Sequence, residues 1–374
     1  MRTFSKSTKL DNVLYDVRGP VVDEAARMED EGERILKLNI GNPAPFGFRT
    51  PDEVIKDMRQ QLPDCEGYSN SRGLFSARKA IMQYSQIKGL PNVQMEHIYT
   101  GNGVSELIQL SMNALLDNGD EILIPSPDYP LWTACATLAG GHPVHYLCDE
   151  QADWYPDLED MESKITSATK ALVIINPNNP TGLRLSAERL LEWHARLVQR
   201  GGWLVVDEAF MDNTPELSLA AHTQRTGLIV LRSFGKFFGL AGVRLGFVLA
   251  EPKLLKLLAE QVGPWAVSGP TRIVGQACLL DTEGHSRQRE RSDLASGRLE
   301  RLLGLHDLPP QGGCALFEWL ITPHAERLYE FMAHRGILLR LFTHNSSVRF
   351  GLPADEADWQ RLEMALAAYT KETT

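Results

Sequence analysis

The stretch Leu228-Ile229-Val230-Leu231-Arg232-Ser233-Phe234-Gly235-Lys236 decides how this chain is interpreted. Its first four residues form a continuous apolar run, which is typical of a buried strand. A polar, glycine-bearing loop follows at once, and such a loop at the end of a buried strand is a common position for a ligand site. The stretch therefore predicts a strand that ends at a binding site containing Lys236.

The side chains at the end of this stretch suit a phosphorylated aldehyde. Lysine in a desolvated site can lose its proton and form a Schiff base with a carbonyl, so Lys236 is a candidate nucleophile. Ser233 and Arg244 lie on either side of it in the sequence and offer a hydroxyl and a guanidinium, which both suit a phosphate. These groups together indicate pyridoxal 5'-phosphate (PLP) as a cofactor. The alternative is an ordinary basic loop after a strand.

The spacing S-x-x-K, with an arginine eight residues after the lysine, resembles the fold-type I PLP-dependent aminotransferases. Three further segments resemble the family in the same order. Residues 101–107 place glycines before a helical pattern, where backbone N–H groups and the helix dipole suit an anion. Residues 176–182 form a turn rich in proline and glycine, and residues 203–210 contain an apolar strand that ends at Asp207. Each segment alone could be a cap, a turn or a strand end.

The resemblance implies a role for the polar groups of these segments. It implies a backbone cradle for the phosphate and three contacts to the ring. The residues are Gly103, Val104 and Ser105 for the cradle, Asn179 for the 3'-oxygen, Asp207 for the pyridine nitrogen, and Tyr129 for stacking. A buried carboxylate costs free energy unless it meets a cation, which the pyridinium would supply to Asp207. Tyr68 matches a tyrosine that reaches the phosphate of the neighbouring subunit, so the resemblance implies a homodimer with shared active sites.

The resemblance also implies a substrate site. Arg349 lies in a β-prone segment and matches the arginine that holds the substrate α-carboxylate, with a structural salt bridge as the alternative. Gly41 and Tyr15 match the N-terminal substrate loop, where glycine would leave room for that carboxylate, and Asn179 would border the same space. Arg340 resembles an arginine that binds a substrate phosphate in histidinol-phosphate-type members, or it is a surface arginine.

Apolar strands alternate with helical patterns from about residue 51 to residue 262, which predicts an α/β fold with a mostly parallel sheet covered by helices on both faces. From residue 264 the pattern changes to a long helix, about 271–303, followed by short strands and helices. We therefore expect an N-terminal arm (1–50) that joins the small domain, a large PLP-binding domain (51–263) and a small α+β domain (264–374). The resemblance implies the same architecture, with the active site between the domains.

The 374 residues carry a formal net charge of −10, which argues against binding to nucleic acid or to an anionic membrane surface. No apolar run approaches the roughly 20 residues needed to cross a bilayer, and residues 1–10 lack the apolar core of a secretory signal. The five cysteines are scattered and the histidines lack metal-ligand spacing, so we expect no disulfide framework and no metal site. These features favour a cytoplasmic protein whose partners are small molecules.

The resemblance is not uniform along the chain. Residues of about 6–182 resemble bacterial alanine aminotransferases, whereas residues of about 190–374 resemble threonine-phosphate decarboxylases of cobalamin biosynthesis. The change falls near the turn at 176–182, which both families share, and we hypothesise a chimera. Phe210 stands where alanine aminotransferases carry a tyrosine, whose hydroxyl helps to hold the 3'-oxygen of the cofactor.

We expect a PLP-dependent enzyme, and we favour transamination of a small amino acid such as alanine, with glutamate or 2-oxoglutarate as partner. Lys236 would move a proton from the substrate Cα, and Arg349 would select the bond that breaks. The same residues would also serve decarboxylation of threonine phosphate, which Phe210 and Arg340 favour. A third possibility is a PLP-binding scaffold with little turnover, because imperfect docking of two halves of different origin would misplace reactive groups.

Overall fold

The structure is a computed structural model. It describes residues 8–10, 13, 20–41, 52–67, 75–90, 92–127, 129–263 and 265–373. Two residues that we expected in the site, Tyr15 and Tyr68, lie outside the described residues.

The largest element is an eight-stranded sheet with the strand order β2-β9-β8-β7-β6-β3-β4-β5. The strands are β2 (Ile98–Gly101), β3 (Glu121–Ser126), β4 (His142–Asp149), β5 (Tyr155–Pro156), β6 (Thr169–Ile175), β7 (Trp203–Asp207), β8 (Leu228–Ser233) and β9 (Gly246–Ala250). The five strands β4, β3, β6, β7 and β8 run parallel to their neighbours in that group. The remaining strands β2, β9 and β5 pair antiparallel, so the sheet is mixed but mostly parallel, as expected.

Helices cover both faces of this sheet, and the strands are therefore apolar on both sides. Along β8, Leu228 and Val230 belong to one apolar core, while Ile229 and Leu231 belong to the other. The first core includes residues of α2 (Asp52–Gln61), α3 (Phe75–Ile87), α6 (Leu158–Lys164), α7 (Ala187–Val198) and α9 (Gly269–Leu280). The second includes residues of α4 (Val104–Leu115), α5 (Leu131–Leu138) and α8 (Pro252–Val262). This alternation explains why the central strands read as continuous apolar runs.

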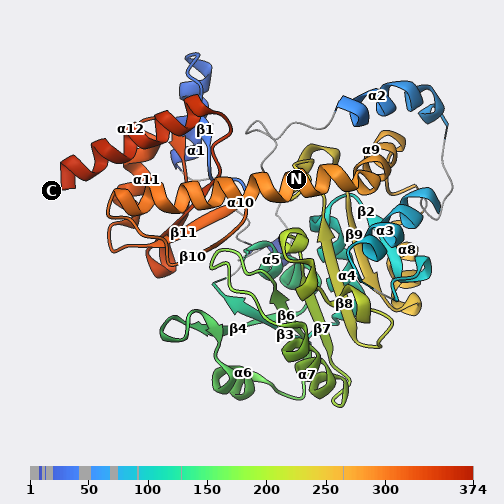
Figure 1. The fold of residues 1–374 in the computed structure, drawn as a ribbon. Helices are drawn as coiled ribbons and strands as arrows, with labels where there is room; N and C mark the ends of the chain where they lie inside the picture. The colour runs from blue at the N-terminus through green and yellow to red at the C-terminus, as the bar shows by residue number, and fades with distance from the viewer. Residues whose placement is uncertain are drawn as a thin grey trace, which may run out of the picture.

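A smaller antiparallel sheet forms the second part of the molecule (Figure 1). Its strands, in the order β10-β11-β14-β13, are β10 (Gly312–Cys314), β11 (Phe317–Ile321), β14 (Ser347–Gly351) and β13 (Arg340–Phe342). The helices α11 (Ala325–Ala333) and α12 (Glu356–Thr373) pack on it through a core of its own. From the N-terminal part, β1 (Leu36–Lys37) pairs with β12 (Ile337–Leu338), and α1 (Pro20–Asp30) packs on α11.

The long helix expected at about 271–303 is two helices. α9 ends at Leu280, and α10 (Thr282–Leu305) begins after Asp281, whose carboxylate accepts a hydrogen bond of 2.8 Å from the Gly284 N–H. α9 packs on α2 and α3 in the core of the large sheet, whereas the last turns of α10 lie in the core of the small sheet. Residues of α10 (Thr282–Leu305), which runs between the two parts, therefore reach the core of the small sheet at its last turns (Figure 1).

No helix among the described residues is both long enough and apolar enough to cross a membrane. All five cysteines are free thiols.

Candidate active site

A cavity of about 180 Å³ lies at the carboxyl ends of the central strands, beside the N-terminus of α4. The expected cofactor residues other than Tyr68 all line it. They are Gly103, Val104, Ser105, Tyr129, Asn179, Asp207, Ser233, Lys236 and Arg244. The structure thus brings together segments that are far apart in the sequence. In parallel sheets the carboxyl ends of the strands form the usual ligand-binding edge, and this cavity follows that rule.

Lys236 follows β8, and its neighbour Phe237 is fully buried, which anchors the loop. Removal of its amine from water, together with the positive charge of Arg349, lowers the pKa of Lys236 to about 8, while Asp207 opposes this shift. Its Nζ lies 5.2 Å from the centroid of the Phe210 ring. A lysine with this pKa has a substantial neutral fraction near neutral pH, and the neutral amine is the form that acts as nucleophile or base.

Asp207 is the last residue of β7 and is 5% exposed. Its carboxylate accepts hydrogen bonds from the Trp132 indole N–H at 3.3 Å and from the Ala209 backbone N–H at 3.0 Å. It forms no ion pair with any residue that the structure describes, and burial raises the pKa of Asp207. A buried carboxylate that has hydrogen-bond donors but no ion-pair contact fits the protonated pyridine nitrogen of PLP.

The opposite end of the cavity suits a phosphate. Gly103 precedes α4 with φ of +85°, and a Cβ added to it would lie 2.6 Å from Arg244 Nη2, so only glycine allows this approach. Arg244 also donates from Nη1 to the Ala241 carbonyl oxygen at 3.2 Å. The positive end of a helix and a guanidinium would repel each other unless an anion lay between them. The residues at this end therefore fit the phosphate group of PLP.

Arg349 lies on β14 and reaches the cavity from the small sheet. It is 6% exposed, and it donates hydrogen bonds to Asn179 Oδ1 and, at 2.8 Å, to the Asn39 carbonyl oxygen. Its Nε is buried without an acceptor, and it pairs with no carboxylate among the described residues. Burial lowers the pKa of Arg349 to about 10, with a further contribution from Arg340. The salt bridge that was the alternative for Arg349 is therefore absent from the described part of the chain.

Two further expected residues border this region. Arg340, on β13, lies directly opposite Arg349 in the antiparallel register, so both side chains project from the same face of the small sheet. Gly41 lies close to the cavity, because a Cβ added to it would be 3.2 Å from Phe210 Cζ and 3.8 Å from Lys236 Nζ. A side chain at residue 41 would therefore crowd the Phe210 ring, whereas the amine of Lys236 lies at ordinary contact distance.

Sequence reasoning did not predict the role of Trp132. This residue is fully buried on α5, and its indole N–H holds the carboxylate of Asp207. A buried tryptophan usually finds an acceptor for its N–H, so a tryptophan three residues after Tyr129 was a usable signal. Phe210 lines the cavity as well. A tyrosine at this position would therefore present its hydroxyl to the candidate site.

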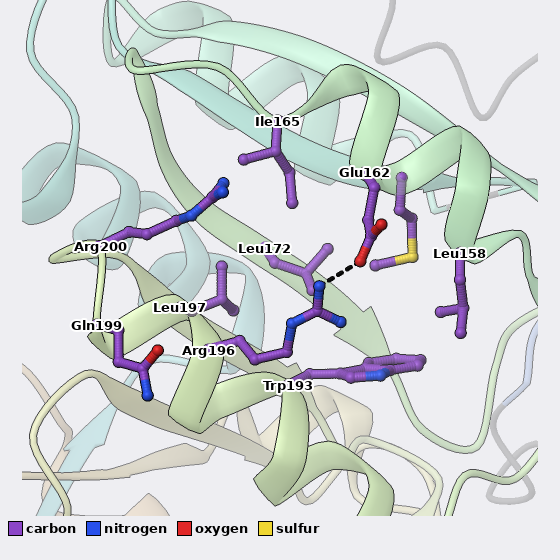
Figure 2. A pocket seen from close by; sticks show the side chains of 10 residues that line it. Leu158, Glu162, Ile165, Leu172, Trp193, Arg196, Leu197, Gln199 and Arg200 are labelled. Carbon is purple, nitrogen blue, oxygen red and sulfur yellow. Dashed lines mark hydrogen bonds and ion pairs between the residues drawn. The ribbon is translucent and has the colours of Figure 1, made fainter.

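A second cavity, of about 430 Å³, lies between α6 and α7 (Figure 2). Its floor is apolar, with Leu172 and Trp193, and the exposed ion pair of Arg196 and Glu162 lies across it. It is larger than the cavity at Lys236, but its charged groups are exposed or already paired. We therefore assign the chemistry to the smaller cavity, where buried charges lack partners. No group of metal-ligating side chains occurs in the described part of the chain.

Comparison with known proteins identifies the family. The model of the class I and II aminotransferases matches residues 33–367. The glutamate-pyruvate aminotransferase AlaA of Escherichia coli is 51% identical over 258 residues, which is 68% of this chain and 64% of that protein. The chain thus spans slightly less than two thirds of the length of this relative.

A threonine-phosphate decarboxylase of Pseudomonas aeruginosa is 50% identical over 263 residues, which is 70% of this chain and 76% of that protein. The two matched stretches together exceed the length of the chain, so they overlap. The matches therefore give no position for the junction of the hypothesised chimera. The crystal structure of an aminotransferase from Escherichia coli superimposes with a TM-score of 0.83 at 37% identity, covering 99% of this chain and 98% of that one. The chain belongs to the class I and II aminotransferases, the PLP-dependent family of fold type I.

Proposed function

We propose that this protein is an aminotransferase that exchanges the amino group of a small amino acid such as alanine with the 2-oxo group of 2-oxoglutarate. One observation carries the proposal. The amine of Lys236, with a pKa of about 8, shares a site with a buried carboxylate that forms no ion pair and a buried arginine that pairs with no carboxylate, among the described residues. The identity to glutamate-pyruvate and alanine aminotransferases supports this choice of substrates.

The lining of the cavity supports one orientation of PLP. The backbone of Gly103 to Ser105, with Ser233 and Arg244, would hold the phosphate, and Asp207 would pair with the ring nitrogen. Asn179 would contact the 3'-oxygen and Tyr129 would stack on the ring. PLP, when bound, supplies an electron sink for the charge that develops at the substrate Cα.

The residues of this chain would then direct the reaction. Arg349 would hold the substrate carboxylate, and Gly41 would leave the space for it. By fixing the carboxylate, Arg349 would turn the Cα–H bond perpendicular to the ring, so that this bond and not the bond to the carboxylate is weakened. The neutral amine of Lys236 would remove the proton at Cα and deliver it to the carbon that carried the aldehyde of PLP.

A second candidate function is decarboxylation of threonine phosphate. The pairing of Arg340 with Arg349 across the two strands favours it, because two adjacent guanidinium groups suit a substrate with a phosphate and a carboxylate. The identity to the Pseudomonas aeruginosa decarboxylase supports it too. A PLP-binding protein with little turnover remains a third candidate if the suspected chimera docks its halves imperfectly.

We also propose that the protein acts as a homodimer in the cytoplasm. The resemblance of Tyr68 to a residue that reaches the phosphate of a neighbouring subunit supports the dimer. The five free thiols favour a reducing compartment.

The first test is the visible absorbance of the protein with PLP, before and after addition of L-alanine. We expect a band of bound PLP that L-alanine bleaches in the wild type and that never forms in Lys236→Ala. Pyruvate formation from L-alanine and 2-oxoglutarate then gives kcat/KM, and release of CO₂ from threonine phosphate reports the second candidate. Arg349→Gln should lower kcat/KM for L-alanine roughly 10- to 150-fold, from the loss of about 1.5–3 kcal/mol of charge-assisted hydrogen bonding.

Arg335→Gln is the matched control, because Arg335 is a partly exposed arginine of the small domain that does not line the cavity. A wild type that forms the PLP band but releases only CO₂ would replace transamination by decarboxylation. A wild type that forms no band would contradict the whole proposal.

A further inference from the structure

A buried ionic network lies behind the cavity. Arg232, on β8 directly before Ser233, is almost fully buried. Its Nη1 lies 3.2 Å from Glu208 Oε2, and its Nη2 lies 2.6 Å from Asp212 Oδ1. Successive side chains of a strand point to opposite faces, so Arg232 lies on the face of β8 away from Ser233 and the cavity. One guanidinium thus connects two carboxylates that neither solvent nor substrate reaches.

Both carboxylates have further partners. Glu208 accepts hydrogen bonds from Ser218 Oγ at 2.6 Å and from the Leu219 N–H at 2.7 Å. Asp212 accepts one from the hydroxyl of Tyr84, on α3. Lys88 lies 3.7 Å from the Asp212 carboxylate and donates to the Asp212 carbonyl oxygen at 3.0 Å. The network therefore fixes the position of residues 208 and 212 from several sides.

The segment 207–212 contributes side chains both to this network and to the cavity. Asp207, Ala209 and Phe210 line the cavity, whereas Glu208 and Asp212 bind Arg232. Arg232 itself is only four residues before Lys236 in the sequence. One side chain thus ties the segment that presents the carboxylate of Asp207 to the strand that leads to the amine of Lys236.

Stability alone does not account for such a network, because a well-packed apolar cluster often stabilises a protein as much as a buried ion pair does. Directional contacts, however, fix one geometry, and reacting groups are sensitive to displacements of about 1 Å. We infer that Arg232 is a positioning residue, which sets the carboxylate of Asp207 and the amine of Lys236 at the spacing that bound PLP requires. The inference rests on the proposed PLP-dependent function.

The test compares Arg232→Lys with the wild type. A single ammonium group cannot form the two-pronged contact to Glu208 and Asp212. We expect the affinity of the apoprotein for PLP, titrated by absorbance, to fall roughly 10-fold and kcat to fall about 100-fold, with KM for L-alanine nearly unchanged. Glu208→Gln keeps the size of the side chain and should lower both the affinity for PLP and kcat by about 3-fold. It provides the test if Arg232→Lys does not fold.

Leu366→Ala is the control for general destabilisation. Leu366 is fully buried in α12 within the core of the small sheet, and it does not line the cavity. We expect the void left by this truncation to lower the melting temperature without changing PLP affinity or kcat. The inference is overturned if the Arg232 or Glu208 variant behaves like Leu366→Ala. PLP affinity needs no amino acid, so a wrong choice of substrate would leave this readout intact, whereas a wild type that does not bind PLP would contradict the proposed function itself.

Discussion

Two arginines of this protein are buried to a similar extent but meet opposite surroundings. Arg232, 2% exposed, binds the carboxylates of Glu208 and Asp212, which outweigh its desolvation and raise its pKa. Arg349, 6% exposed, donates hydrogen bonds to an amide oxygen and a backbone carbonyl oxygen and lies over the Phe317 ring, with no carboxylate partner among the described residues, and its pKa is lowered to about 10. One arginine is neutralised within the protein, and the other retains an uncompensated charge beside a cavity.

The carboxylates show the same contrast. Desolvation alone would raise the pKa of Asp212, but Arg232 and Lys88 hold it below its ordinary value. The pKa of Asp207 is raised by burial, and its hydrogen bonds only reduce this effect. In the network Arg232 forms ion pairs with Glu208 and Asp212, although burial still raises the pKa of Glu208, whereas Asp207 and Arg349 at the cavity form no ion pair among the described residues. Uncompensated buried charges mark a binding site, because the free energy that they cost is recovered when the ligand binds.

The largest effect is expected from removing each arginine in the apoprotein. Arg232→Met leaves two buried carboxylates without their cation, so it should lower the free energy of unfolding by about 3–5 kcal/mol. Arg349→Met removes a buried charge that has no counter-ion, so it should leave the free energy of unfolding unchanged or raise it. Denaturant titrations of both apoproteins measure the difference. Equal losses would mean that Arg349 is a structural arginine and that the contrast is wrong.

An intermediate effect is expected from the two carboxylates as pH changes. The folded-state pKa of Asp207 lies above 3.8, so the native state holds this proton more tightly than the unfolded state. The contribution of Asp207 to stability therefore falls as pH rises from 3.8 through its raised folded-state pKa, and Asp207→Asn should melt a few degrees higher at neutral pH, with the gain vanishing near pH 3.8.

Asp212→Asn is the matched control for that measurement. The folded-state pKa of Asp212 lies below 3.8, so its contribution to stability is present above that pH and is lost as pH falls through the lower folded-state value. Asp212→Asn should therefore melt at a lower temperature than the wild type at neutral pH. Melting curves of the apoproteins from acid to neutral pH separate the two cases, and shifts of the same sign would refute the distinction.

The smallest effect is expected from Phe210→Tyr. The Phe210 ring lines the cavity and packs edge-on against Phe317 at 5.2 Å between centroids. A hydroxyl at this position could donate a hydrogen bond to the 3'-oxygen of PLP, which would contribute about 0.5–1.5 kcal/mol. We expect PLP to bind roughly 2- to 10-fold more tightly, as measured by absorbance titration, and unchanged affinity would mean that Asn179 alone satisfies this oxygen.

Much of the fold could be predicted from local pattern. The apolar runs that became β6, β7 and β8 predicted a buried parallel sheet, because strands covered on both faces lack polar alternation. The break between α9 and α10 was missed, because residues on both sides favour a helix and only the cap at Asp281 separates them. That cap was readable, since an aspartate before Thr282 and Glu283 is a common helix start.

The candidate site also has features that the sequence predicts and features that depend on packing. The sequence by itself determined the residues that chemistry requires, namely a lysine, a carboxylate and a phosphate cradle in a recognisable order, since these depend on short motifs at the ends of strands. Only the tertiary structure decided which charges are compensated. Tyr84 and Asp212 are 128 residues apart, and Asn179 and Arg349 are 170 residues apart. Periodicity and motifs report local surroundings, whereas a buried charge finds its partner, or lacks one, only when distant segments pack together.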